Sequence, residues 1–146
     1  MKRVYANEKW CLGCHLCEYY CAFADLGAKG EQDMARALKD VTINPKISIE
    51  EKEGICFAVS CRHCAEPLCM KGCITGALRA EQGVITIDKD KCVECYTCIL
   101  CCPYGAIAPS ANGAIQKCEL CVHSADPQPA CVKGCPNGAL VFEERA

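Results

Sequence analysis

Apolar residues in this chain occur in short stretches, and their pattern predicts small strands and brief helices rather than long elements. Residues 84–88 read Val-Ile-Thr-Ile-Asp after a glycine, which is typical of a strand in a hairpin. Residues 140–143 and the apolar stretch 54–59 indicate two more strands, and residues 1–21 are expected to begin with another. No apolar run in the sequence is long enough to cross a bilayer.

The segment 22–60 contains no dense cysteine group and is interpreted as an insertion. Its pattern predicts a helix over residues 31–39 and a strand over residues 41–43, closed by Asn44 and Pro45. Two interpretations stay open at this point. The insertion is either a surface elaboration or a docking surface for a partner subunit.

Cysteine dominates the composition, with 18 of 146 residues, or about 12%. The hydrophobic fraction of 51% includes these cysteines, and only about 38% of the chain remains for an ordinary apolar core. A scaffold of this kind is expected to depend on cross-links or bound inorganic groups for part of its stability. The formal net charge of −2 gives no basic surface and argues against nucleic acid as a partner.

Three chemistries use this much cysteine: disulfides, structural zinc and iron–sulfur clusters. The first ten residues carry charges but neither an apolar signal segment nor a twin arginine. We therefore expect a cytoplasmic protein, in which thiols stay reduced and a disulfide framework does not form. The spacing of the cysteines distinguishes the two remaining kinds of site. Zinc sites usually consist of two C-x2–4-C pairs that are distant in the sequence.

The cysteines form four groups of four, here called motifs one to four. Motifs one and three share the spacing C-x2-C-x2-C-x3-C: Cys11, Cys14, Cys17 and Cys21, and Cys92, Cys95, Cys98 and Cys102. Motifs two and four are wider, C-x2-C-x4-C-x3-C and C-x2-C-x9-C-x3-C: Cys61, Cys64, Cys69 and Cys73, and Cys118, Cys121, Cys131 and Cys135. Motifs two to four continue as x-x-Gly-Ala-aliphatic, whereas motif one does not.

Three cysteines at intervals of three, with a fourth four residues later and followed by proline, form the bacterial ferredoxin run. A tight loop of this kind wraps three irons of a cubane, and the fourth cysteine serves the other cluster of a pair. We expect this fourth cysteine at the start of a helix, because proline suits the first helical position. Two cysteines remain outside the motifs. Cys56 is expected to behave as a small hydrophobe, and Cys101 competes with Cys102, although the repeat and Pro103 favour Cys102.

Several other residues lie in or beside the motifs. Three histidines are not expected to be ligands, since the cysteine sets are complete: His15, His63 and His123. Three aromatic residues are expected to pack over clusters and limit access of solvent: Trp10, Tyr96 and Tyr104. Lys91 and Lys117 precede motifs three and four and are candidates to offset cluster charge, although exposed lysines often contribute nothing measurable.

The four motifs resemble the four-cluster, polyferredoxin-type electron-transfer subunits of the dimethyl sulfoxide reductase and formate dehydrogenase iron–sulfur subunit family. The form C-x2-C-x2-P-x-C-x3-C of motif two, with Pro67, is particularly specific, and the resemblance covers nearly the whole chain. The opening residues 10–17 are most similar to the soluble small subunits that serve tungsten aldehyde oxidoreductase or carbon monoxide dehydrogenase.

The resemblance implies a nested pairing in which motif one exchanges its fourth cysteine with motif four, and motif two with motif three. The implied first set is Cys11, Cys14, Cys17 and Cys135. The implied second set is Cys118, Cys121, Cys131 and Cys21. The implied third set is Cys61, Cys64, Cys69 and Cys102, and the fourth is Cys92, Cys95, Cys98 and Cys73.

The expected fold is α+β, with two pseudo-symmetric bacterial-ferredoxin-like modules, short helices and hairpins around four 4Fe-4S cubane clusters, and little regular secondary structure. Residues 1–21 with 118–146 would form the outer module, residues 61–117 the inner module, and residues 22–60 the insertion, all in one compact unit.

The expected function is that of an electron-transfer subunit without catalytic residues. By resemblance its partners are a catalytic oxidoreductase, namely a tungsten or molybdenum aldehyde oxidoreductase or carbon monoxide dehydrogenase, and a ferredoxin or flavoprotein acceptor, in a hetero-oligomer without a membrane span. Two alternatives stay open: a zinc-binding interaction module, and an iron–sulfur enzyme with its own substrate site. The sequence contains no G-x-G-x-x-G, P-loop or H-E-x-x-H motif that would favour an enzyme.

Overall fold

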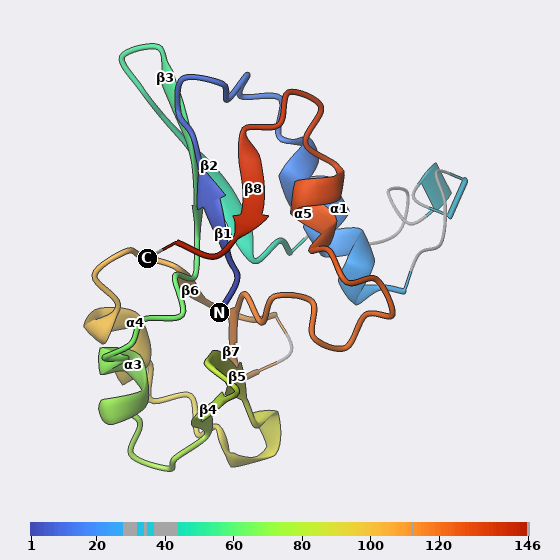
Figure 1. Ribbon diagram of the computed structural model, residues 1–146. Helices are drawn as coiled ribbons and strands as arrows, with labels where there is room; N and C mark the ends of the chain where they lie inside the picture. The colour runs from blue at the N-terminus through green and yellow to red at the C-terminus, as the bar shows by residue number, and fades with distance from the viewer. Residues whose placement is uncertain (28–31, 34, 37–43, 112, 146) are drawn as a thin grey trace.

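The computed structural model describes residues 1–27, 32–33, 35–36, 44–111 and 113–145 (Figure 1). The expected strand over 41–43 lies outside the described residues, and so does most of the expected helix over 31–39. Within the described ranges, no helix has the length and apolar character needed to span a membrane.

Among the described residues, the strands form four antiparallel two-stranded sheets. The pairs are β1 (Arg3–Ala6) with β8 (Leu140–Glu143), β2 (Ile47–Lys52) with β3 (Ile55–Ser60), β4 (Leu78–Glu81) with β5 (Val84–Ile87), and β6 (Ile107–Pro109) with β7 (Ile115–Lys117). The strands expected near residues 84–88, 140–143 and 54–59 are confirmed. Two hairpins turn through paired residues with positive φ, Glu53-Gly54 and Gln82-Gly83, as two-residue hairpin turns require.

The helices are short, as expected, but they do not begin at the fourth cysteine. Of the helices with bounds in the described ranges, the longest is α1 (Leu16–Asp25). Shorter ones are α3 (Leu68–Lys71), α4 (Thr97–Cys101) and α5 (Ala130–Lys133), with a 3-10 turn η1 (Lys89–Lys91). Cys102 follows the end of α4 with extended backbone, because the ring of Pro103 disfavours a helical conformation at the preceding residue. The prolines that precede helices are instead Pro67 and Pro129.

The expectation about the fourth cysteine was therefore wrong in every motif. Cys21 lies inside α1, whereas Cys73, Cys102 and Cys135 lie just beyond the ends of α3, α4 and α5. The helices carry the third cysteine of each motif and end before or at the fourth, except in α1, which continues past it.

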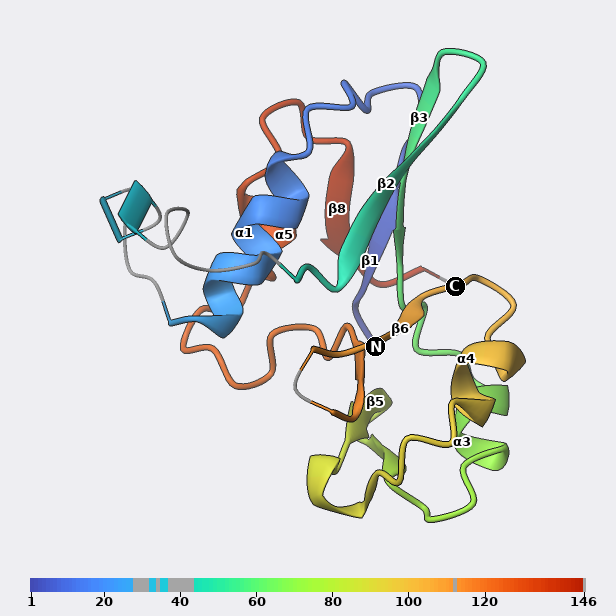
Figure 2. The ribbon, with the colours of Figure 1, turned by 180° about the vertical axis from the view of Figure 1, so that it is seen from behind.

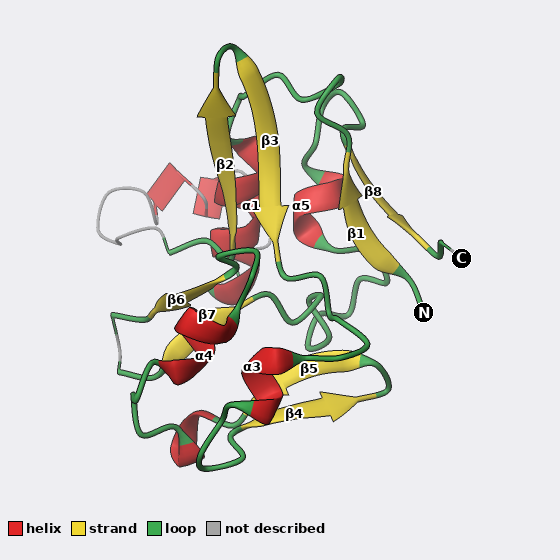
Figure 3. Cartoon of the chain, turned by 90° about the vertical axis from the view of Figure 1, so that its left-hand side faces the viewer, coloured by secondary structure: helices red, strands yellow, loops and turns green. Residues whose placement is uncertain are grey.

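The elements gather in two groups (Figures 1 and 2). In one group α1 packs against α5, with β1, β8, β2 and β3 beside them. In the other, α3 packs against α4, next to the hairpins β4–β5 and β6–β7 (Figure 3). Motif one thus lies beside motif four, and motif two beside motif three.

Part of the presumed insertion belongs to the core. Ile47 of β2 and Ala58 of β3 are buried and pack with Cys17, Cys21 and Leu140. The interpretation of residues 22–60 as a surface elaboration therefore does not hold for Ile47 and Ala58, through which the β2–β3 hairpin packs into the core beside α1. The second core contains buried side chains from four strands and α4: Leu78, Ile85, Cys98, Ile107 and Ile115.

Gly134 allows α1 to approach α5 closely. A Cβ atom placed at this position would lie 2.1 Å from Cδ2 of the Tyr20 ring. Replacing Gly134 by alanine is therefore expected to lower the free energy of unfolding by about 1–3 kcal/mol, since the ring has to move out of a packed interface. Denaturant titration of the cluster-loaded protein measures the loss.

Gly76→Ala is a control of a different kind, because nothing lies within 4 Å of a Cβ there and only the positive φ of +64° opposes it. If Tyr20→Ala in the same chain restored the stability lost in Gly134→Ala but not the stability lost in Gly76→Ala, contact with the Tyr20 ring would be the cause of the loss. Equal stability of Gly134→Ala and the parent protein would contradict this account.

Candidate metal centres

The cysteine loops share one backbone feature: the residue before the second cysteine has a positive φ. These residues are Gly13 (63°), His63 (44°), Glu94 (56°) and Leu120 (55°). His15 and Tyr96, which follow the second cysteine in motifs one and three, are also left-handed, at 60° and 56°. Such conformations are costly for residues other than glycine and persist where the surroundings impose them, as they do at functional sites.

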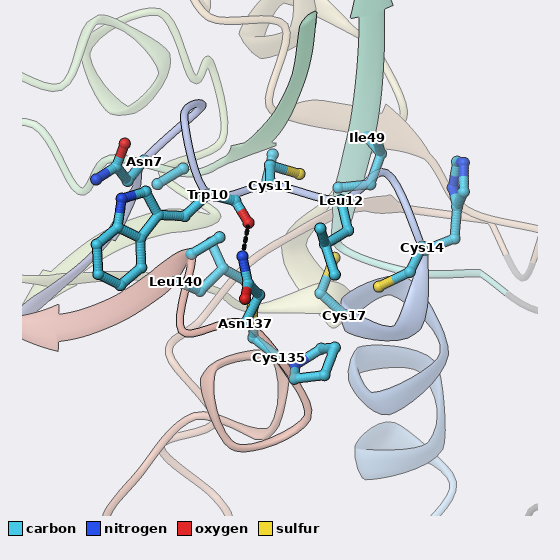
Figure 4. A pocket seen from close by; sticks show the side chains of 15 residues that line it. Asn7, Trp10, Cys11, Leu12, Cys14, Cys17, Ile49, Cys135, Asn137 and Leu140 are labelled. Carbon is cyan, nitrogen blue, oxygen red and sulfur yellow. Dashed lines mark hydrogen bonds between the residues drawn. The ribbon is translucent and has the colours of Figure 1, made fainter.

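The first predicted set lines a cavity between α1 and the chain that follows α5. Cys11, Cys14, Cys17 and Cys135 all contribute to its wall, together with Trp10 and Leu12 (Figure 4). The side-chain amide of Asn137 donates a 2.6 Å hydrogen bond to the carbonyl oxygen of Trp10 and ties the two sides together. Burial raises the pKa of the Cys17 thiol to about 11, and the charges of Glu18, Cys11 and Cys135 contribute in the same direction.

The second predicted set is the most deeply buried. Burial raises the pKa of Cys118 to about 12 and that of Cys21 to about 11. Burial also raises the pKa of Cys131, and the charges of Cys118, Cys21 and Cys121 add to the effect. Two backbone N–H groups donate to sulfur here: Lys46 to Cys21 at 3.3 Å and Leu120 to Cys118 at 3.4 Å.

The third predicted set also draws on two motifs. Burial raises the pKa of Cys61, and the charges of Cys102 and Cys64 act in the same direction. Burial raises the pKa of Cys69 as well, with contributions from Cys61 and Cys102. The structure thus brings Cys102 of motif three to the first and third cysteines of motif two.

The fourth predicted set lines a second cavity. Its wall includes Cys73, Cys92, Cys95 and Cys98, with Val93 and Tyr96. Burial opposes ionisation of Cys73, but the N–H groups of Leu78, Thr75 and Ala77 and the hydroxyl of Thr75 together bring its pKa below the ordinary value. The N–H and hydroxyl of Thr97 likewise lower the pKa of Cys95.

These surroundings fit 4Fe-4S clusters. Each cavity is walled by four cysteines from two motifs, and all eighteen cysteines are free thiols. Thiolates are the usual ligands of such clusters, and N–H donors to sulfur adjust their potentials. A buried thiol with a raised pKa keeps its proton unless a metal displaces it, so loading is expected to release protons.

The two cysteines outside the motifs lie against glycines of the cysteine loops. A Cβ atom at Gly13 would lie 2.7 Å from the Sγ of Cys56, which is in β3. A Cβ atom at Gly72 would lie 2.9 Å from the Sγ of Cys101, at the end of α4. Both thiols fill space where the backbone of another motif passes, in keeping with the small hydrophobe expected for Cys56.

The histidines in the motifs have different surroundings, although their positions in the sequence are similar. The imidazole of His15 contacts the Glu18 carboxylate at 2.7 Å, whereas His63 is buried and its Nδ1 accepts a 3.0 Å hydrogen bond from the Ile85 N–H. Burial and the charges of Lys117 and Arg3 lower the pKa of His63 to about 3.

The aromatic residues cover the cavities only in part. Trp10 and Tyr96 line the two cavities but remain 56% and 41% exposed. Tyr104 contributes to neither cavity wall and instead contacts the guanidinium of Arg62, 4.9 Å from the ring centre. The expectation that Tyr104 packs over a cluster stays a prediction, since the two cavities belong to the first and fourth sets and Tyr104 follows Cys102 of the third.

Comparison with known proteins supports the assignment of these cysteine sets to an iron–sulfur protein. A family model described as a 4Fe-4S dicluster domain matches residues 53–145, which is more than half of the chain. The chain belongs to the 4Fe-4S dicluster domain family. Membership of this family makes it an iron–sulfur protein and identifies 4Fe-4S clusters as its cofactor type.

Relatives of this 4Fe-4S dicluster protein extend the match to almost the entire chain. An iron–sulfur protein of Rhodospirillum rubrum is 33% identical over 153 aligned residues, covering 94% of this chain and 79% of the relative. The electron transport protein HydN of Escherichia coli is 30% identical over 158 residues, covering 97% and 87%. The beta subunit of NADH-dependent phenylglyoxylate dehydrogenase of Aromatoleum evansii is 39% identical over 137 residues, but the match covers only 27% of that subunit.

Sequence reasoning missed two features of the centres. The strand β2 was not predicted, although Ile47 and Ile49 alternate with polar residues. Sequence reasoning also did not separate Lys91, whose side chain is 52% exposed, from Lys117, which is 1% exposed. The apolar residue Ile115, two positions before Lys117 in β7, was the available signal that this side of the strand faces inward.

Proposed function

We propose that the protein is an electron-transfer subunit that carries electrons through four 4Fe-4S clusters between a catalytic oxidoreductase and a ferredoxin or flavoprotein acceptor. The observation that carries the proposal is that cysteines of neighbouring predicted sets lie close enough for their charges to act on one another. The charge of Cys17, in the first set, raises the pKa of Cys131 in the second, and the charge of Cys61, in the third, raises that of Cys118. The packing of α3 on α4 joins the third set to the fourth.

The two ends of this series are the accessible ones. Cys14 in the first set and Cys95 in the fourth are exposed, whereas each middle set has only buried or half-buried cysteines. Exposed apolar side chains lie close to both ends in the sequence: Leu12 and Trp10 beside Cys14, and Val93 and Tyr96 beside Cys95. Apolar side chains around an accessible redox centre suit contact with a protein partner.

The clusters would supply the one-electron chemistry, and the chain would control it. The cysteines would hold four centres in sequence, and the N–H groups of Lys46, Leu120 and Thr97 would donate to sulfur. The apolar residues around Cys17 and Cys98 would limit access of water. No substrate chemistry by the chain's own side chains is needed for this role.

The resemblance supports a more specific catalytic partner: a tungsten or molybdenum aldehyde oxidoreductase, or carbon monoxide dehydrogenase. The relative in Aromatoleum evansii is itself a subunit of an oxidoreductase, which is compatible with a subunit role here. A cytoplasmic hetero-oligomer remains part of the proposal.

Metal analysis after purification without oxygen tests the cofactor. We expect about sixteen irons and sixteen sulfides per chain, four of each for every cubane, with negligible zinc. Zinc at about four to six atoms per chain would support the interaction module instead. Iron well below sixteen would indicate an incompletely ligated cluster, as the enzyme alternative requires.

Electron transfer is tested with the loaded protein. The protein is first reduced stoichiometrically by dithionite and then mixed with oxidised ferredoxin or a flavoprotein. We expect the clusters to be reoxidised within the turnover time of a redox enzyme. The measurement is the loss of the EPR signal of the reduced clusters. A fully loaded protein that neither accepts nor passes on electrons would contradict the proposed function.

A further inference from the structure

Lys117 is a lysine whose whole side chain lies inside the protein, at the end of β7. It is 1% exposed, and its ammonium group donates hydrogen bonds to the carbonyl oxygens of Ile85 and Cys118, the second at 2.6 Å. Both acceptors are uncharged. Burial of an ammonium group is costly unless something nearby compensates the charge.

The compensation does not come from a carboxylate. Among the described residues, no aspartate or glutamate lies within ion-pair distance of Lys117. The nearest acid in the sequence, Glu119, instead accepts a 2.7 Å hydrogen bond from the N–H of Ile87. The charge of Lys117 is therefore left to act on its other neighbours, which are the neutral imidazole of His63 and several cysteines.

These cysteines belong to two different predicted sets. Cys118, the next residue in the chain, is in the second set, and the positive charge of Lys117 opposes the rise in its pKa. The same charge opposes the rise in the pKa of Cys61 and Cys69, both in the third set. The hydrogen bonds give the same position: the ammonium group contacts the carbonyl oxygen of Cys118 in the second set and that of Ile85, whose N–H donates to His63, the residue before Cys64 of the third set. Lys117 thus lies between the two middle centres of the series.

The position of the ammonium group is fixed by the outer edge of β5. The Ile85 carbonyl accepts from Lys117, the Ile85 N–H donates to His63 at 3.0 Å, and the Ile87 N–H donates to Glu119. Side chains from motifs two and four and from β7 therefore meet on one strand. This arrangement holds the charge at a defined place rather than on a mobile surface side chain.

We propose that Lys117 raises the reduction potentials of the second and third clusters by holding a positive charge between them. The inference rests on the proposed function, since it needs clusters on both sets. Each cluster accepts one electron from an external donor such as dithionite and becomes more negative by one charge, and a buried cation nearby favours that reduced state.

The size of the effect follows from Coulomb's law. At the effective dielectric constant of about 20 that describes charges inside proteins, a buried unit charge close to a redox centre is expected to change the equilibrium constant for its reduction about tenfold. Since the ammonium group of Lys117 is buried and contacts the carbonyl oxygen of Cys118, a ligand of the second set, removal of its charge is expected to lower the equilibrium constant for one-electron reduction at least tenfold. For one electron this is a shift of about 59 mV to more negative potential.

The test is an EPR-monitored redox titration of the loaded Lys117→Met protein, with iron and sulfide measured on the same sample. We expect two of the four reduction potentials to become more negative, by at least the shift that corresponds to a tenfold lower equilibrium constant. The other two potentials are expected to stay unchanged. In Lys117→Arg, which keeps the charge, the equilibrium constants for reduction are expected to stay within threefold of those of the parent protein. The matched control is Lys91→Met, since Lys91 precedes motif three in the same way but is exposed and 3.5 Å from Asp88.

The outcomes separate this inference from the proposed function. A parent protein without about sixteen irons would overturn the proposed function. A fully loaded Lys117→Met protein with unchanged potentials, or a Lys117→Arg protein shifted as far as Lys117→Met, would overturn only the role of the charge. If Lys117→Met does not load, Lys117→Gln, which keeps a donor for the two carbonyls, is titrated under the same criterion. If neither neutral variant loads four clusters, the role of Lys117 is structural and the inference is wrong.

Discussion

Replacement of Cys102 by serine is expected to remove one cluster, whereas replacement of the adjacent Cys101 leaves all four. Cys102 lies close enough to Cys61 and Cys69 for its charge to raise their pKa values, while the Sγ of Cys101 is directed at Gly72. Iron is therefore expected to fall from about sixteen to about twelve per chain in Cys102→Ser and to stay near sixteen in Cys101→Ser. Iron and sulfide analysis of protein purified without oxygen measures the difference.

The nested assignment makes this prediction sharper. If Cys102 completes the set of motif two, Cys102→Ser and Cys64→Ser should lose the same EPR signal, and Cys73→Ser should lose a different one together with Cys95→Ser. A shared signal for Cys102→Ser and Cys95→Ser would instead place all four cysteines of motif three on one cluster. That result would reject the exchange between motifs, although not the presence of clusters.

Removal of all iron is expected to abolish cooperative unfolding of the protein. The buried apolar residues of the described chain include four cysteines of the predicted sets and four alanines: Cys17, Cys21, Cys98 and Cys131, and Ala22, Ala58, Ala77 and Ala139. Of the other nine buried apolar side chains among the described residues, seven are divided between two separate cores, and the described sheets have only two strands each. Since metal binding contributes directly to folding in such scaffolds, the loss is expected to exceed the 5–15 kcal/mol stability of an ordinary domain.

The measurement is thermal unfolding followed by circular dichroism, before and after anaerobic chelation of the iron. The loaded protein should show a cooperative transition, and the metal-free protein should show none. Reconstitution with iron and sulfide should restore the transition, which separates loss of the cluster from chemical damage to the thiols. A metal-free chain that kept the cooperative transition would show that the apolar cores suffice.

Strands and helices were predictable from the sequence where residues within a few positions of one another determine the backbone conformation. The strands β5 and β8 and the short helices follow from β-branched stretches, glycine turns and prolines within a few residues. The helix boundaries were not predictable in this way. Proline suits the first position of a helix, but the ring of Pro103 also disfavours helical backbone at Cys102, and here the second effect decides. The β2–β3 hairpin was assigned to the surface because no local signal reveals that Ile47 packs against Cys21 of another element.

By itself the sequence determined the chemistry of this protein: the number, type and spacing of its cysteines predict iron–sulfur clusters, and the family match bears this out. The tertiary structure alone decided which loops lie together, with α1 on α5 and α3 on α4, and which of two similar lysines is buried. The physical reason is that ligand type depends on side chains close in the sequence. The neighbours of a charge, and so its effect on a potential, depend on contacts between segments far apart in the sequence.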